Sequence, residues 1–464
     1  MSSHSTEPDT LGAVSERLAV IARGLHLTGA AVCVAAIAAV SVRSPGGMSP
    51  AQLAVFYGIP AAALFFFVVA ARARPAVRVD LVLLTAAAGV GLCIAEIALQ
   101  LTPTPQQWEG IPAEVGASDL RTKLQVVRDL RAEGIHAFPG YSPWLLRGLG
   151  ATLDDANTMP LAQGPSFATT VMCNEGPGWL VYQTDQYGFR GNGPWTDSAQ
   201  VLVLGDSFAA GLCVADGEDI ASQLRHRWPS TWNLGVAGAG PLHELAVLRE
   251  FGPVLRPSVV VWIYYEGNDL SDLGDELASP LMARYLAPSF RLDVPARQPQ
   301  VDRYLGELLD SVYDATLAAE QRGEPAQPAR SVVVAAKEAV KLTRVRAVLR
   351  LGHLPRPDPL GRLPEVVRLG RDTAGEWGGQ VVLVYLPAYA RFEGRLREST
   401  VGHEEFLAMA ADLGLPVVDL VRVFSARNDP GSLWIHPRGH LRVEGYRVSA
   451  EAVGEAIDDL VRAP

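Results

Sequence analysis

Residues 201–208 (VLVLGDSF) constrain the fold more than any other part of this chain. Four consecutive aliphatic residues predict a strand buried on both faces, as in a parallel sheet. The run then stops at a small residue, an acid and a serine, and open α/β sheets place their chemistry at such strand ends. The same three residues suit an ordinary turn or a helix N-cap, so this segment alone leaves both interpretations open.

Three later segments add polar residues in a recognisable order. Residues 232–241 (WNLGVAGAGP) contain glycines that let backbone N–H groups turn toward a ligand. Residues 258–265 predict a second buried strand, which ends in 266–269 (EGND), and residues 439–446 (GHLRVEGY) precede an amphipathic helix. The order serine, glycine, asparagine, histidine resembles the SGNH branch of the GDSL hydrolases over about residues 198–462.

The resemblance implies a role for one residue in each segment. Ser207 would be the nucleophile, His440 the base that accepts its proton, and Gly238 and Asn268 donors to the oxyanion, together with the backbone of Ser207. A serine hydroxyl needs such a base, and an imidazole with a pKa near ~6.5 suits the task. The implied fold is a flavodoxin-like three-layer α/β sandwich with a parallel sheet, preceded by an all-α transmembrane segment.

One position departs from the family pattern. Family members commonly carry an aspartate two or three residues before the histidine, where this chain has Arg438 and Pro437. Either another carboxylate serves, or a serine–histidine dyad works alone, or the site is an inactive ligand-binding descendant. Three carboxylates lie nearby in the sequence: Asp419, Asp429 and Glu444.

The other histidines point to no metal site. His436 lies too close to Gly439 to match the family's spacing, which His440 and Gly445 do match, so His436 is interpreted as a structural neighbour. We predict no metal and no cofactor, because the remaining histidines beyond residue 101 stand alone without cysteine or carboxylate support. These are His136, His226, His243, His353 and His403.

The first 101 residues predict a membrane region. Their three apolar stretches approach the ~20 residues that cross a bilayer. Three arginines cluster between the second and third stretches, which by the positive-inside rule places that loop and the N-terminus in the cytoplasm. Everything after about residue 102 is then extracytoplasmic. The stretches are 18–42, 52–71 and 80–101, and the arginines are Arg72, Arg74 and Arg78.

Four cysteines divide between these regions. Cys33 and Cys93 fall in the apolar stretches and are interpreted as small apolar residues. Cys173 and Cys213 belong to the exported part, where they form either one disulfide or two buried thiols; the disulfide is our prediction.

The sequence predicts a membrane region, an extension and a hydrolase domain that carries a helical insertion. In an enzyme, that insertion would serve as a lid or an acceptor platform. The boundaries are 1–101, 102–197 and 198–464, with the insertion at 270–361. Helices are expected at 301–319, 331–351, 363–377 and 404–413, and further strands at 380–386 and 416–420.

These features predict a membrane-anchored serine esterase that removes O-acyl groups, such as O-acetyl, from a glycan or lipid of the cell envelope. The alternatives are an acyltransferase with the same serine intermediate and an inactive binding or assembly module. A net charge of −10 argues against nucleic acid as a partner. The sequence names no protein partner and no oligomeric state.

Overall fold

The computed structural model describes eight stretches of the chain, which divide into two units. Residues 8–101 make up the first unit, and the remaining described residues make up the second. The described stretches are 8–43, 53–101, 119–143, 159–176, 178–321, 359–393, 402–437 and 439–462.

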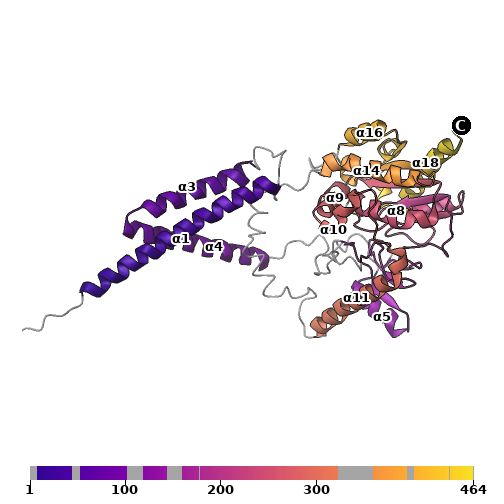
Figure 1. Ribbon diagram of the computed structural model, residues 1–464. Helices are drawn as coiled ribbons and strands as arrows, with labels where there is room; N and C mark the ends of the chain where they lie inside the picture. The colour runs from indigo at the N-terminus through magenta and orange to yellow at the C-terminus, as the bar shows by residue number, and fades with distance from the viewer. Residues whose placement is uncertain are drawn as a thin grey trace, which may run out of the picture. The chain divides into compact units, whose positions relative to one another are not determined.

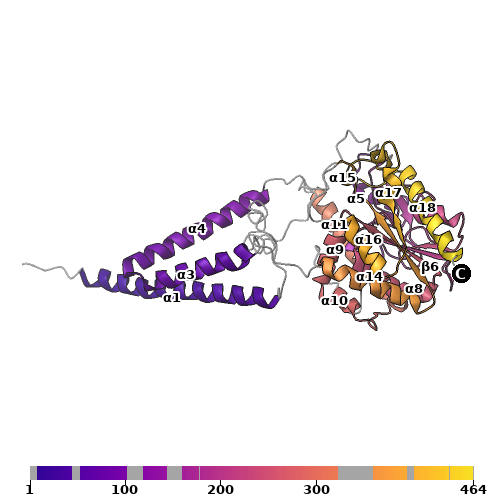
Figure 2. The same ribbon diagram turned by 90° about the horizontal axis from the view of Figure 1, so that it is seen from above.

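The first unit consists of three helices that lie side by side (Figures 1 and 2). They include segments long and apolar enough to cross a membrane, at Glu16–Ser41, Ala54–Arg72 and Pro75–Glu96. Many of their large apolar side chains face outward, which suits apolar surroundings. The helices predicted from the sequence are thus confirmed. Their bounds are α1 Pro8–Arg43, α3 Ile59–Arg72, which continues a π-helical turn at Ala54–Gly58, and α4 Pro75–Leu101.

The second unit is built on a five-stranded parallel sheet, as predicted. The strand order is β5-β4-β6-β7-β8, so β4, which comes first in the chain among these five strands, lies inside the sheet between β5 and β6. This is the flavodoxin-like order, whose switch point falls at the first and third strands. The bounds are β4 Val201–Leu204, β5 Thr231–Asn233, β6 Val259–Tyr265, β7 Gln380–Leu386 and β8 Val417–Asp419.

Helices cover both faces of this sheet and give three layers (Figure 2). Side chains alternate between the faces, so Leu202 and Leu204 enter one core while Val201 and Val203 enter the other. The first face packs against α8 Pro241–Leu255, α14 Pro359–Gly375 and α16 His403–Asp412. The second face packs against α7 Ile220–Arg225, α17 Leu420–Ser425 and α18 Val443–Arg462.

A smaller sheet precedes the large one. Strand β1 (Ala137–Pro139) pairs in parallel with β2 (Thr169–Val171), which pairs antiparallel with β3 (Val181–Gln183). The other helices are α5 Lys123–Ala132, α9 Asp269–Leu277, α10 Pro280–Ala283, α11 Gln298–Gln321 and α15 Tyr389–Phe392. Short 3₁₀ turns lie at Arg284–Leu286, Pro295–Arg297 and Pro430–Leu433.

The expected elements that lie within the described residues are present with small differences in their bounds, and β5 is a strand that the sequence did not predict. Strand β8 ends one residue early, because the Asp419 side chain accepts the Val421 N–H at 3.0 Å and caps α17. The helix expected at 331–351 lies outside the described residues, as does Arg438. The domain boundaries at 101, 197, 270 and 361 stay predictions.

Candidate active site

Adjacent strands bring Ser207, Gly238 and Asn268 to one edge of the sheet. Each follows the carboxyl end of its own strand, β4, β5 and β6 respectively, and these three strands are neighbours in the order β5-β4-β6. Ser207 and Asn268 therefore flank the switch point, where open sheets bind ligands.

The loops after β4 and β5 are in close contact. The Val236 N–H donates to the Gly205 carbonyl at 3.0 Å. At Gly235 the backbones approach so closely that a Cβ would lie 2.2 Å from the Ala210 nitrogen. Gly238 adopts a φ of 75°, a left-handed conformation that favours glycine. Glycine is therefore required at Gly235 by the close approach of the backbones and is favoured at Gly238 by the backbone conformation.

His440 lies in the loop before α18 and packs onto the nucleophile segment. Its ring centre is 5.0 Å from that of Phe208, whose ring centre in turn lies 4.3 Å from that of Tyr265, the last residue of β6. The Tyr446 hydroxyl donates to the Leu212 carbonyl at 3.0 Å and ties α18 to the same segment. The structure thus gathers the four predicted site residues at one edge. The Ser207 hydroxyl donates to Asp206 Oδ2 at 3.4 Å.

The carboxylate beside His440 comes from a segment that the sequence did not single out. Both Glu175 oxygens lie 3.0 Å from His440 Nδ1, and Oε2 also accepts the His440 backbone N–H at 2.7 Å. Glu175 is 265 residues earlier in the chain, so the family's motif spacing could not reveal it. The sequence did give one indication. Cys173 lies two residues before Glu175, and we predicted that Cys173 is bridged to the nucleophile segment.

The three carboxylates considered from the sequence are engaged or placed elsewhere. Asp419 lies 2.9 Å from His403 Nε2. Glu444 accepts from Arg447 at 2.7 Å, and Asp429 is exposed. His436 Nε2 lies 3.7 Å from Glu175 Oε2, so this histidine neighbours the same carboxylate.

The predicted disulfide between Cys173 and Cys213 is present, with a Cα–Cα separation of 5.4 Å. Cys213 Sγ lies 3.3 Å from His440 Nδ1, so the bridge borders the histidine directly. Cys33 and Cys93 are free thiols in the first unit.

Charges around His440 favour its protonated form. Burial alone would lower its pKa, but the negative charge and hydrogen bonds of Glu175 raise it above the usual value, with a smaller contribution from Asp206. Burial pushes the pKa of Glu175 upward, yet the histidine's charge leaves it below its usual value. Burial also raises the pKa of Asp206 to about 6. Glu175 is therefore the ionised partner of the ring.

Four potential metal-ligand side chains lie within 4.8 Å of one another: Cys173, Glu175, Cys213 and His440. Metal binding to cysteine requires the thiolate, and here the two sulfurs are joined to each other. The glutamate and the histidine bind each other instead. The cluster is thus a disulfide beside an ion pair.

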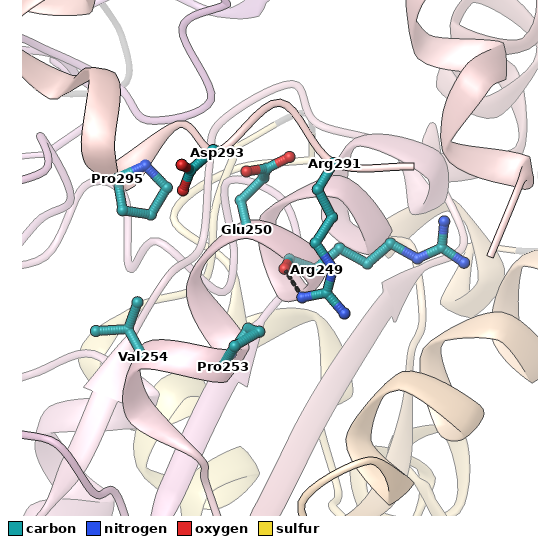
Figure 3. A pocket seen from close by; sticks show the side chains of 7 residues that line it. All are labelled: Arg249, Glu250, Pro253, Val254, Arg291, Asp293 and Pro295. Atoms are coloured by element: carbon teal, nitrogen blue, oxygen red, sulfur yellow. Dashed lines mark hydrogen bonds between the residues drawn. The ribbon is translucent and has the colours of Figure 1, made fainter. Parts of the chain in front are cut away.

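Two cavities of the second unit lie away from Ser207. One, of about 310 Å³, adjoins the C-terminal half of α8 (Figure 3), and its Arg291 donates to the Arg249 carbonyl at 2.7 Å. The other, of about 550 Å³, includes Gln380 and Pro416, at the amino ends of β7 and β8. Both therefore adjoin the edge of the sheet opposite the candidate site.

No family model and no curated protein matches the chain. Solved structures do match. TesA is 14% identical, with a TM-score of 0.30, over 56% of this chain and 98% of that one. A lipase/acylhydrolase from Enterococcus faecalis is 15% identical, with a TM-score of 0.31, over 56% and 96%.

A G-D-S-L family lipolytic protein from Veillonella parvula DSM 2008 is 10% identical, with a TM-score of 0.30, over 57% of this chain and all of that one. Two of these three structures are thus described as a lipase/acylhydrolase and as a lipolytic protein of the G-D-S-L family. At these identities and TM-scores they say nothing of the site, so the roles of its residues rest on the contacts described above.

Proposed function

We propose that this chain is a membrane-anchored serine esterase of the SGNH type. Its substrate would be an O-acyl ester, such as an O-acetyl group, on a glycan or lipid of the cell envelope. The observation that carries the proposal is the contact between His440 and Glu175, at the sheet edge that also holds Ser207. A histidine supported by a carboxylate near a serine is the arrangement that activates a hydroxyl for acyl transfer.

The proposed reaction proceeds through an acyl-serine. Glu175 occupies His440 Nδ1, which leaves Nε2 to take the proton of Ser207 as its Oγ bonds to the ester carbon. The backbone N–H groups of Ser207 and Gly238 and the Asn268 amide would stabilise the oxyanion. The C–O bond to the leaving alcohol then breaks, and the alcohol takes the proton from His440.

Water completes the cycle. His440 removes a proton from the water, whose oxygen bonds to the acyl carbon, and the bond to Ser207 Oγ then breaks. The products are the free acid and the restored serine, to which His440 returns its proton. No cofactor is required by this sequence of steps.

The proposed membrane location supports an envelope substrate. Three helices able to cross a membrane, with arginines between the second and third, would put the second unit outside the cytoplasm. The absent aspartate was the main argument for an inactive binding module, and Glu175 now provides a carboxylate in its place. An acyltransferase would share the same intermediate and differ only in the acceptor.

Covalent labelling tests the nucleophile. The full-length chain in detergent should react with a fluorophosphonate at one site, with the mass increase lost in Ser207→Ala and labelling slowed by at least about 10³-fold in His440→Ala. Ser432→Ala, which removes an exposed hydroxyl of the same unit, is the matched control and should label like wild type. A folded wild-type chain that does not label would contradict the proposal.

The acceptor is tested separately. The esterase should release free acetate from p-nitrophenyl acetate and from an O-acetylated glycan without any added acceptor. Acetate release that appears only when a sugar acceptor is added would point to the acyltransferase instead.

A further inference from the structure

We infer that Glu175 is the positioning residue for His440 and that the Cys173–Cys213 disulfide, by holding Glu175 in place, is required for full activity. The inference rests on the proposed esterase function. It goes beyond that function by assigning a role to the extension before the hydrolase domain and to the disulfide. The reacting groups and the group that orients them would thus come from distant parts of the chain.

The contact with Glu175 fixes His440 at two points. One carboxylate oxygen receives the backbone N–H at 2.7 Å, and both oxygens lie 3.0 Å from Nδ1 of the ring. A carboxylate at Nδ1 holds the proton on that nitrogen, so Nε2 stays free to act as the base. Backbone and ring therefore depend on the same side chain, and removal of its charge should affect both tautomer and orientation.

The disulfide limits how far Glu175 can move from the nucleophile segment. Cys173 and Glu175 are separated by one residue, or two Cα steps of ~3.8 Å. Cys213, at the other end of the bridge, is six residues after Ser207, and the backbone N–H of Leu212 donates to the Ser207 carbonyl at 3.0 Å. Without the bridge, Glu175 would lose its covalent link to the segment that carries the nucleophile.

Noncovalent contacts hold the Glu175 segment on two sides. Met172 and Leu180 share a backbone hydrogen bond of 2.9 Å, and the Asn174 amide donates to the Asp119 carbonyl at 2.8 Å. These contacts hold the segment to the extension. On the other side, the same segment packs in one apolar cluster with the loops after β4 and β5, which contribute Ala210, Leu212 and Ala237. The disulfide adds a covalent restraint to this packing.

The charges around the ring predict a change in pH dependence. The titratable groups that face this region are Glu175, Asp206, His436, Tyr265 and Tyr446. The Glu175 charge raises the pKa of His440 against the effect of burial, and the base works only when neutral. Replacing Glu175 with a neutral isostere should lower that pKa, so the acidic limb of kcat/KM should move to lower pH.

The first test is Glu175→Gln in the full-length chain, with p-nitrophenyl acetate as substrate. We expect kcat to fall by roughly 10³–10⁴-fold, with the acidic limb shifted to lower pH. Asp429→Asn, which removes an exposed carboxylate near His440 in sequence, should change neither. A glutamate that served folding alone would not move the pH profile.

The second test is Cys173→Ala/Cys213→Ala, which avoids leaving a free thiol beside the histidine. We expect a loss of kcat that approaches the Glu175→Gln loss, and little further loss when all three changes are combined, since both act through one contact. Cys33→Ala/Cys93→Ala is the matched control and should keep wild-type activity. Tryptophan fluorescence should show that each variant is folded.

The outcomes separate the two proposals. If Ser207 of the wild type is not labelled by the fluorophosphonate, the esterase function fails. If Ser207 is labelled but Glu175→Gln keeps wild-type kcat and pH profile, the positioning role alone is wrong. If the losses of kcat for Glu175→Gln and for the double cysteine variant are fully additive, the proposed action of the disulfide through Glu175 is wrong. Glu175→Gln still tests the positioning role if the double cysteine variant fails to fold.

Discussion

The Asn268 side chain has the geometry of a donor that a neighbour holds in place. Its Nδ2 donates to Asp272 Oδ2 at 2.8 Å, one turn further along α9. An amide nitrogen carries two N–H groups, so this bond uses one and leaves the second for an oxyanion. Asp272 thus orients Asn268 without using up its capacity to donate.

We predict that Asn268→Ala lowers kcat on p-nitrophenyl acetate by about 10²–10³-fold, the usual cost of one oxyanion donor. Asn268→Asp should be worse than Asn268→Ala, because a carboxylate would repel both the oxyanion and Asp272. Steady-state kinetics over a range of substrate concentrations checks both. Equal activity of the two variants would exclude charge stabilisation by this side chain.

The residues of the site differ in how far the sequence revealed them. Ser207 and Asn268 each follow an apolar strand within a few residues, so local pattern and the rules of parallel sheets sufficed to place them together. Gly238 follows β5 (Thr231–Asn233), which is not an apolar run, so its place was indicated only by the resemblance to SGNH hydrolases. Glu175 gave no such signal, because its partner is 265 residues away and its segment contains neither a long strand nor a helix. The Cys173–Cys213 pair was the only clue from the sequence that this segment approaches the site.

The N-terminus of helix α8, which follows the Gly238 loop, is capped by a side chain of helix α9. Its N-cap is Gly240, which has no side chain to accept the first N–H groups. Glu276 of α9 accepts them instead, from Gly240 at 2.6 Å, Leu242 at 3.0 Å and His243 at 3.2 Å. A buried carboxylate at a helix N-terminus satisfies these donors and interacts favourably with the helix dipole.

We therefore predict that Glu276→Ala destabilises the second unit by about 2–3 kcal/mol, because it leaves buried donors unpaired. Glu276→Gln should cost less, since one oxygen can still accept. All seven tryptophans among the described residues belong to the second unit, so thermal unfolding followed by tryptophan fluorescence reports mainly on this unit. Glu451→Ala, which removes an exposed carboxylate on α18, is the control and should stay within about 0.5 kcal/mol of wild type.

Four of the five strands of the large sheet were predictable for a simple physical reason, whereas β5, which has no aliphatic run, was not predicted. A strand buried on both faces is a continuous aliphatic run, and β7 accordingly begins and ends at the residues predicted for it. Strand β8 is shorter than predicted. The hydropathy of residues 416–420 predicts a strand, but it gives no indication that the Asp419 side chain caps α17. Pattern thus determines which elements exist, while side-chain hydrogen bonds determine where they end.

At the scale of the whole molecule, the proposed function depends on which side of the membrane the second unit occupies. Arg72, Arg74 and Arg78 lie at the junction of α3 and α4. Basic residues near the ends of spans stay in the cytoplasm, so this junction should lie inside. In the proposed topology, a third span would then carry the chain outward, into a compartment where a disulfide such as Cys173–Cys213 persists.

Reporter fusions test this orientation. Alkaline phosphatase joined to the C-terminus should be active and green fluorescent protein there should be dark, whereas fusions after Ala73 should give the reverse. A fluorescent C-terminal fusion would place the second unit in the cytoplasm, where the disulfide would be reduced and an envelope glycan would be out of reach. Ester hydrolysis by Ser207 would still be possible there, so the labelling experiment and the fusion experiment test the chemistry and its location independently.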